Sequence, residues 1–275
     1  MAADLHIHTT ASDGRLNPGE VVEQAVQAGL NCIAITDHDT VDGLKILMEE
    51  NKEGLRIIPG IEFSTDLPQH EVHILGYYID WCEDELCSCL ERLAAGRQTR
   101  LRLMVDKINR LGYKIDYERV IEIAGNSVAV GRPHVAKALV EQGFFPSVND
   151  VFKSLLRKNG PAYVPHYKFT PLEVINLIKK AGGFAVLAHP GLIGSDNIVA
   201  ELIRLGLDGL EVYHPEHNTE QTEKYLQIAE KNSLFVTGGS DFHGIPGRFP
   251  PVLGIFTIDS NLVTRMERLR YKVQA

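Results

Sequence analysis

Histidine and carboxylate side chains recur along this chain at spacings that suit metal binding. His6 and His8 stand two positions apart near the start of the sequence. Residues i and i+2 of an extended strand point to the same side, so these two imidazoles can bind one ion together. Asp13 follows within a Ser-Asp-Gly turn sequence that can return its carboxylate toward the pair. A His-x-His spacing alone is more often incidental, so the prediction of a metal site depends on the rest of the chain.

Further residues of the same types stand where predicted strands end. Short apolar runs predict strands at 32–35, 56–58, 72–77, 185–188, 209–212 and 234–237. Histidine or carboxylate side chains follow four of these runs, and one histidine lies within a fifth: His38, Glu62, His189, Asp241, His243 and His73. Barrels and open α/β sheets assemble their sites at the C-terminal ends of strands, where ions satisfy buried polar groups. We therefore predict nine metal ligands: His6, His8, Asp13, His38, Glu62, His73, His189, Asp241 and His243.

Nine nitrogen and oxygen ligands are too many for one ion. Two or three ions that share carboxylates would use them, with Glu62 and Asp241 as the candidate bridges. A set without thiolate favours Mn, Zn or Fe over copper, and its many histidines make Mg the least favoured ion. Within this set we predict that five residues act directly in catalysis: Asp13, His38, Glu62, Asp241 and His243.

The elements that must position these residues alternate along the chain. Each predicted strand is nearly continuous in apolar residues, as strands buried on both faces are. Asn17-Pro18 and Thr170-Pro171 predict helix starts, because each places proline directly after an N-cap residue. Strands alternating with helices predict a parallel α/β sheet, either open or closed into a barrel.

One stretch breaks this alternation and contains no convincing strand. Residues 84–159 show helical periodicity, as in the apolar series Leu101, Met104, Val105, Ile108 and Leu111. We interpret residues 1–83 and 160–275 as a discontinuous α/β domain, and residues 84–159 as a helical insertion that covers the active site.

The insertion is locally basic in an acidic chain. Residues 91–119 hold eight Lys or Arg and four Asp or Glu, against a net charge of −8 for the whole chain. Helical spacing places Arg97 and Arg100 in line with the apolar stripe, where an unpaired charge is costly. A phosphate bound bidentately would satisfy both guanidinium groups, and Arg132 and His134 are candidates for the same task. The alternative is that internal ion pairs with acids of the insertion satisfy them.

Composition excludes several classes of protein. The 275 residues are 44% hydrophobic and 23% charged, which are ordinary values for a globular protein. The acidic net charge argues against a surface that coats duplex DNA. Four cysteines without a Cys-x-x-Cys pair, no leader segment and no apolar run of about 20 residues predict a soluble cytoplasmic protein that does not enter a membrane.

Five short motifs, taken in order, resemble those of the PHP (polymerase and histidinol phosphatase) family. The motifs are Asp4-Leu5-His6-Ile7-His8-Thr9 with Ser12-Asp13-Gly14, Thr36-Asp37-His38-Asp39, Pro59-Gly60-Ile61-Glu62, Ala188-His189-Pro190-Gly191 and Ser240-Asp241-Phe242-His243-Gly244. The resemblance implies a distorted (β/α)7, TIM-like barrel with a trinuclear site for phosphoester hydrolysis. It implies one ion on His6, His8, Glu62 and Asp241, a second on Glu62, His73 and His189, and a third on Asp13, His38 and His243.

The insertion and the Gly131-Arg132-Pro133-His134 motif resemble those of small bacterial members of that family. This implies hydrolysis of a phosphate monoester of a small nucleotide, a nucleoside 3′,5′-bisphosphate or an AMP-like compound, through attack by a metal-activated hydroxide, with 5′-3′ trimming of short single-stranded RNA as an added activity. The alternatives are a phosphatase of the histidinol-phosphate type, a processive exonuclease and a non-catalytic metal-binding module. We assign no role to His70, His166, His214 and His217.

Overall fold

Two compact units make up the chain. The structure is a computed structural model that describes residues 2–50, 54–67, 70–125, 130–165 and 167–274. Unit 1 comprises Met1–Cys87 and Phe169–Ala275, and unit 2 comprises Ser88–Lys168. Each unit is described by itself below.

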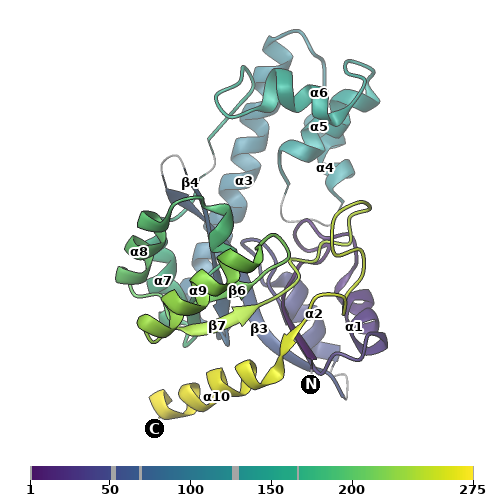
Figure 1. Ribbon diagram of the computed structural model, residues 1–275. Helices are drawn as coiled ribbons and strands as arrows, with labels where there is room; N and C mark the ends of the chain where they lie inside the picture. Colours follow the sequence, from purple (N-terminus) through teal and green to yellow (C-terminus); the bar gives the residue numbers. More distant parts are fainter. Residues whose placement is uncertain (1, 51–53, 68–69, 126–129, 166, 275) are drawn as a thin grey trace. The chain divides into compact units, whose positions relative to one another are not determined.

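A barrel of strands forms the centre of unit 1 (Figure 1). The strands are β1 (Ala2–Ile7), β2 (Cys32–Ile35), β3 (Arg56–Leu67), β4 (His70–Tyr77), β5 (Phe184–Leu187), β6 (Gly209–Tyr213), β7 (Phe235–Gly238) and β8 (Ile258–Asp259). Their order in the sheet is β7-β6-β5-β4-β3-β2-β1-β8. The segment after β7 returns to β1, because the backbone N–H of His8 donates to Phe242 and that of Phe242 donates to His6. Strands β1 to β7 therefore nearly close a TIM-like barrel, which confirms the predicted fold class.

The sheet is not parallel throughout, and here the prediction was wrong. β3 pairs antiparallel with β4, and β4 pairs antiparallel with β5. The reason is that no helix separates β3 from β4, and a short connection between neighbouring strands reverses the chain direction. β3 also runs far beyond the predicted 56–58, and β1 and β8 were not among the predicted apolar runs.

Helices of unit 1 pack against the outside of this barrel. They are α1 (Pro18–Gln27), α2 (Asp42–Glu50), α7 (Pro171–Lys180), α8 (Asp196–Arg204), α9 (Thr219–Lys231) and α10 (Ser260–Gln274), with a 3₁₀ turn at Pro190–Leu192. α7 packs against β4 and β5, and α9 against β6 and β7 (Figure 1). Asn17 and Thr170 are the N-caps of α1 and α7, each in a capping box, as predicted.

Unit 2 is helical, and its described residues contain no strand. α3 (Asp84–Arg110) begins at the end of unit 1 and is followed by α4 (Tyr117–Ala124), α5 (Arg132–Glu141), α6 (Val148–Val151) and a π-helical turn at Phe152–Leu156. The predicted apolar stripe of α3 is buried from Leu101 to Ile108 in a core with residues of α4 and α5. Leu111 is exposed, because the helix ends at Arg110. None of the described helices combines the length and apolar character that a bilayer span needs.

Candidate metal centre

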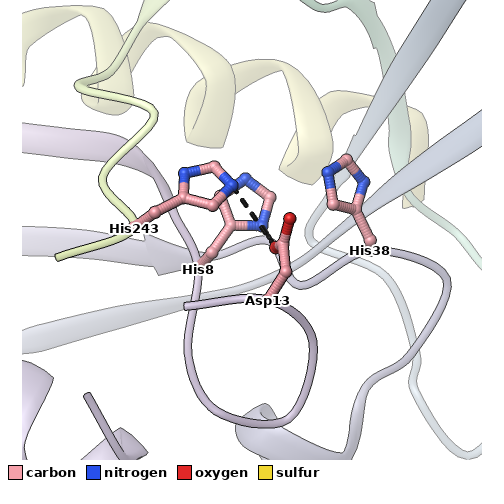
Figure 2. Close-up of side chains that lie close together, drawn as sticks. All are labelled: His8, Asp13, His38 and His243. Atoms are coloured by element: carbon pink, nitrogen blue, oxygen red, sulfur yellow. Dashed lines mark ion pairs between the residues drawn. The ribbon is translucent and has the colours of Figure 1, made fainter. Parts of the chain in front are cut away.

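All nine predicted ligands belong to unit 1 and lie close together. His6 is in β1 and His8 follows it, Glu62 is in β3 and His73 is in β4. The others follow strands: Asp13, His38, His189, Asp241 and His243. Figure 2 shows His8, Asp13, His38 and His243 directed toward one another. The strands and the segments that follow them thus bring these imidazoles and carboxylates to one end of the barrel.

The antiparallel strand β4 explains how His73 reaches this end. His73 pairs with Ser64 of β3, and Ser64 lies two residues beyond Glu62. Residues i and i+2 of a strand share a face, as do directly opposite residues of neighbouring strands. His73 and Glu62 are therefore on the same face, and His73 Nδ1 lies 2.9 Å from Glu62 Oε1.

The Glu62 carboxylate lies at the centre of the cluster, with imidazoles near both of its oxygens. Its Oε2 lies 3.2 Å from His6 Nε2, 3.2 Å from His8 Nε2 and 3.3 Å from His38 Nδ1. Its Oε1 faces the other side, 2.9 Å from His73 Nδ1 and 3.1 Å from His189 Nε2. A carboxylate with imidazoles on both oxygens is placed as a bridge between ions would be.

Two aspartates extend the cluster. Asp241 Oδ1 lies 3.2 Å from His8 Nε2 and 3.5 Å from both His6 Nε2 and His243 Nδ1. Asp13 Oδ1 lies 3.3 Å from His243 Nε2 and 3.7 Å from His8 Nδ1 (Figure 2). Asp13 is half-exposed, whereas Asp241 is mostly buried.

Orphaned polar atoms show that these residues fit metal ions. Buried side-chain atoms without a hydrogen-bond partner include His6 Nε2, both ring nitrogens of His8, His38 Nδ1 and Glu62 Oε2. Buried polar atoms are normally paired, so such a concentration calls for a ligand. Three groups have ligand atoms near enough to share an ion: His8, Asp13, His38 and His243; His6, His8 and Asp241; His38, Glu62 and His73. The donor set of imidazole nitrogen and carboxylate oxygen suits divalent transition metals.

Burial and opposite charge act against each other on the pKa values of these groups. Burial lowers the pKa of His8, but the neighbouring carboxylates of Asp241 and Glu62 outweigh it and raise the pKa to about 10. Burial raises the pKa of Glu62, but the charges of His38 and His6 lower it well below its ordinary value. Burial lowers the pKa of His38 to about 4. The neighbouring imidazoles thus favour the ionised form of Glu62, which is the form that binds a metal ion.

Strained backbone and close approach also position the site. His189 and Asp241 adopt positive φ values of 29° and 50°. Such values are costly for residues other than glycine, and they cluster where function requires a particular orientation. A Cβ on Gly239 would lie 2.4 Å from the backbone N of His6, so only glycine lets the segment after β7 pass this close to β1.

Several supporting residues were missed by the sequence interpretation. Glu211 of β6 is fully buried, and it accepts hydrogen bonds from His6 Nδ1 at 2.9 Å and from the backbone N–H of His189 at 2.8 Å. Buried Asp37 accepts from the backbone N–H and hydroxyl of Thr9 and from the hydroxyl of Ser12. An acid within an apolar strand, as at Glu211, is the signal that could have revealed the first of these residues.

Asp241 has further partners on its second oxygen. Oδ2 lies 2.5 Å from Arg248 Nη2 and 3.7 Å from His214 Nε2. His214 is buried and was assigned no role from the sequence. Its Nδ1 accepts a hydrogen bond from the backbone N–H of Glu216, so in the neutral ring the proton is on Nε2, toward Asp241. Arg248 thus donates to Oδ2, with His214 Nε2 nearby but beyond hydrogen-bond distance, while Oδ1 faces the other imidazoles.

The predicted substrate-binding residues Arg97, Arg100, Arg132 and His134 belong to unit 2. Arg100 Nε donates to the backbone O of Val164, and Arg132 Nη1 donates to that of Leu156. Within the described residues, neither Arg100 nor Arg132 forms an ion pair. Burial, with the nearby charges of Arg132 and Arg97, lowers the pKa of Arg100 to about 10.

The remaining histidines have other surroundings. His134 Nδ1 accepts the backbone N–H of Gly131, at the start of α5. His217 Nε2 accepts that of Gly191, and His70 lies at the start of β4. His166 lies outside the described residues.

A family model and curated proteins match most of this chain. The PHP domain model matches residues 4–236. The chain is 32% identical to the phosphoribosyl 1,2-cyclic phosphate 1,2-diphosphodiesterase of Eggerthella lenta. That alignment covers 92% of this chain and 98% of the relative. It is 36% identical to the 5′-3′ exoribonuclease Rnm of Salmonella typhimurium, in an alignment that covers 87% of this chain and 84% of the relative. It is 32% identical to the 3′,5′-nucleoside bisphosphate phosphatase of Chromobacterium violaceum, in an alignment that covers 89% of this chain and 87% of the relative.

A solved structure is similar over nearly the whole chain. It is a Bifidobacterium adolescentis protein described provisionally as a metal-dependent phosphoesterase. The TM-score is 0.83 at 34% identity, and the alignment covers 98% of this chain and 96% of the other.

Proposed function

This chain belongs to the PHP family and hydrolyses phosphoester bonds, and we propose that its substrate is a phosphate monoester of a small nucleotide, with a nucleoside 3′,5′-bisphosphate as the first candidate. The single observation that carries this choice is the group of arginines in unit 2. Arg100 is part-buried beside like charges and, within the described residues, pairs with no acid. A phosphate would supply the missing counter-charge.

The metal complement is also a proposal. We propose three divalent ions, of Mn, Zn or Fe rather than Mg. His6, His8, Glu62 and Asp241 would hold the first, Glu62, His73 and His189 the second, and Asp13, His38 and His243 the third. The grouping of neighbouring ligand atoms supports the first and third sets, since His6, His8 and Asp241 form one group and Asp13, His38 and His243 share another. For the second set, Glu62 Oε1 lies near both His73 Nδ1 and His189 Nε2.

The chemistry divides between the ions and the chain. Bound divalent ions supply Lewis acidity, which acidifies a water and stabilises charge on phosphoryl oxygens. The carboxylate ligands Asp13, Glu62 and Asp241 contribute −3 and buried Glu211 a further −1, which is still less than the +6 of three ions. The loaded pocket is therefore cationic within a chain of net charge −8, and it attracts a phosphate monoester without a broadly basic surface.

The arginines of unit 2 are candidates for binding a part of the substrate. We propose that Arg97, Arg100 and Arg132 bind a second phosphate, and that His134 donates to the substrate from the start of α5. The Chromobacterium violaceum relative acts on 3′,5′-nucleoside bisphosphates, which carry two phosphates. Short RNA with a 5′ phosphate offers the same pair of charges, and the Salmonella typhimurium relative is an exoribonuclease. We include 5′-3′ trimming of short single-stranded RNA as a second candidate activity, with no action on duplex DNA.

The cellular setting is also a proposal. All four cysteines are free thiols, and Cys32 and Cys89 are buried. Reduced thiols are typical of the cytoplasm, and we place the protein there.

Phosphate release tests the substrate class. Protein loaded with Mn or Zn is given adenosine 3′,5′-bisphosphate, AMP, histidinol phosphate and a 5′-phosphorylated short RNA. Inorganic phosphate is measured for the first three, and released mononucleotides are measured for the RNA. We expect the highest kcat/KM for the bisphosphate, and a drop of about 10-fold or more for it in Arg100→Ala, since a charge-assisted hydrogen bond contributes about 1.5–3 kcal/mol. Arg110→Ala, an exposed arginine of the same helix, is the matched control.

Other outcomes point to the alternatives. Preference for histidinol phosphate, with Arg100→Ala unchanged, would overturn the nucleotide assignment. Preference for the RNA would favour the exoribonuclease.

A further inference from the structure

Glu211 is a buried carboxylate within an otherwise apolar strand. It lies in β6, Gly209–Tyr213, and its side chain is 0% exposed. A charge at such a place is costly unless it is paired. Both oxygens have a partner: Oε1 accepts from His6 Nδ1 at 2.9 Å, and Oε2 accepts from the backbone N–H of His189 at 2.8 Å. Each partner residue is a predicted ligand.

The hydrogen bond between Glu211 and His6 determines which ring nitrogen of His6 can bind an ion. An ionised carboxylate only accepts hydrogen bonds, so His6 Nδ1 must carry the proton. The lone pair of the neutral ring is then on Nε2. That atom is buried without a hydrogen-bond partner and lies 3.2 Å from Glu62 Oε2 and 3.5 Å from Asp241 Oδ1. Glu211 thereby directs the ligating atom of His6 toward the centre of the cluster.

The second contact holds the backbone of His189. This residue has a φ of 29°, a strained value for a residue with a side chain. The hydrogen bond to Glu211 stabilises the peptide group in that conformation. From there the imidazole reaches the cluster, with Nε2 3.1 Å from Glu62 Oε1.

We propose that Glu211 is a positioning residue for two metal ions at once. It holds the ring of His6, which belongs to the first proposed ion site, and the backbone of His189, which belongs to the second. Within the described residues Glu211 forms no hydrogen bond or ion pair with Asp13, His38 or His243, so the third site does not depend on it. This inference rests on the proposed metal centre.

Glutamine at this position separates positioning from mere packing. Glu211→Gln preserves the shape of the side chain, but its amide has one acceptor oxygen and one donor nitrogen. Both partners of Glu211 are donors. Glutamine therefore leaves one donor unsatisfied, or it favours the His6 tautomer with the proton on Nε2. In that tautomer Nε2 has no lone pair to offer an ion in the cluster. A residue that only fills space would tolerate this change.

Metal content is the first measurement. Metal-free wild-type protein, Glu211→Gln and the control Glu216→Gln are titrated with Zn²⁺ against a chromophoric chelator. Glu216 is exposed and lies five residues along the same segment. We expect three ions in the wild type and the control. In Glu211→Gln we expect affinity lower by about 10- to 100-fold at two sites, as for other residues that support metal ligands, and one site unchanged.

Nitrogen NMR of the Zn-loaded protein is the second measurement. With ¹⁵N-labelled histidine, we expect the wild type to show His6 protonated on Nδ1 and bound through Nε2. In Glu211→Gln the Nδ1–H signal should disappear or move. The wild-type spectrum tests the proposal even if the variant does not fold, because a His6 proton on Nε2 overturns it.

The outcomes separate this inference from the proposed function. Three sites of wild-type affinity in Glu211→Gln, with an unchanged His6 signal, would overturn the role of Glu211 and leave the metal centre intact. A wild-type protein that binds no ion would instead overturn the metal centre, and the role of Glu211 with it.

Discussion

Asp13 differs from the other carboxylates of the cluster in being half-exposed. Its Oδ1 faces His243 Nε2 at 3.3 Å and His8 Nδ1 at 3.7 Å. Because little of the fold packs against it, Asp13 can be removed without opening the core. It is therefore the ligand whose loss best separates chemistry from stability.

Asp13→Ala should abolish most turnover while preserving the fold. We expect kcat to fall by at least about 100-fold, the effect of removing one preorganised charge at a reaction centre. We expect the midpoint of unfolding of the metal-free protein to change little. Rates of phosphate release and thermal unfolding check the two parts, with exposed Glu23→Ala in α1 as the control. Wild-type turnover in Asp13→Ala would contradict the proposed third ion site.

Cysteine reactivity offers a prediction independent of the metal. Burial raises the pKa of the Cys32 thiol to about 12, whereas Cys82 is exposed. The thiolate is the reactive form, and a raised pKa means that less of it is present at a given pH. Iodoacetamide at pH 8 should therefore label Cys82 and leave Cys32 intact in native protein, as mass spectrometry of peptides would show. Equal labelling of both would mean that β2 is not buried as described.

At the scale of elements, the loop after β1 depends on a carboxylate from another strand. Asp37, which follows β2, accepts three hydrogen bonds from Thr9 and Ser12. These contacts fold the segment that carries Asp13. The loop, which carries both His8 and Asp13, therefore depends on Asp37 for its conformation.

Two replacements of Asp37 should destabilise this loop to different extents. Asp37→Ala removes both acceptor oxygens and with them three hydrogen bonds, and it should lower the free energy of unfolding by about 2–4 kcal/mol, at about 1 kcal/mol for each buried hydrogen bond. Asp37→Asn keeps one acceptor oxygen and should cost about half as much. Denaturant unfolding measures both differences. Equal costs for the two variants would show that the hydrogen bonds are not what holds the loop.

The elements also show what local sequence can and cannot predict. His38 and Asp241 were recognised because each follows a short apolar run, and that pattern is local. The antiparallel entry of His73 through β4 and the contact of Glu211 with His6 are pairings between distant segments. Local periodicity carries no information on such pairings, so the sheet was predicted as parallel and Glu211 was overlooked. The helix starts at Asn17 and Thr170 were predictable because an N-cap acts within its own turn.

For the whole molecule, the buried charges connect metal binding to stability. The barrel of unit 1 encloses Glu62, Glu211 and several imidazoles. Among the described residues, Glu62 Oε2 and several of the ring nitrogens have no hydrogen-bond partner. In an unfolded chain these groups are solvated and far apart. Ions that bind the folded barrel and not the unfolded chain therefore stabilise it by mass action.

Metal addition and removal should shift the unfolding temperature of unit 1. An ion at 100 times its Kd contributes about 2.7 kcal/mol, so Mn²⁺ or Zn²⁺ should raise Tm by several degrees and EDTA should reverse the rise. Unit 2 carries none of the nine predicted ligands, so hydrogen exchange should show the added protection in β1, β3 and β4 and not in the core of α3 around Met104. In Glu211→Gln the rise should be smaller, because two of three sites are weakened. A metal-dependent Tm shift with protection spread equally over both units would argue that the ions act elsewhere than at the cluster around Glu62.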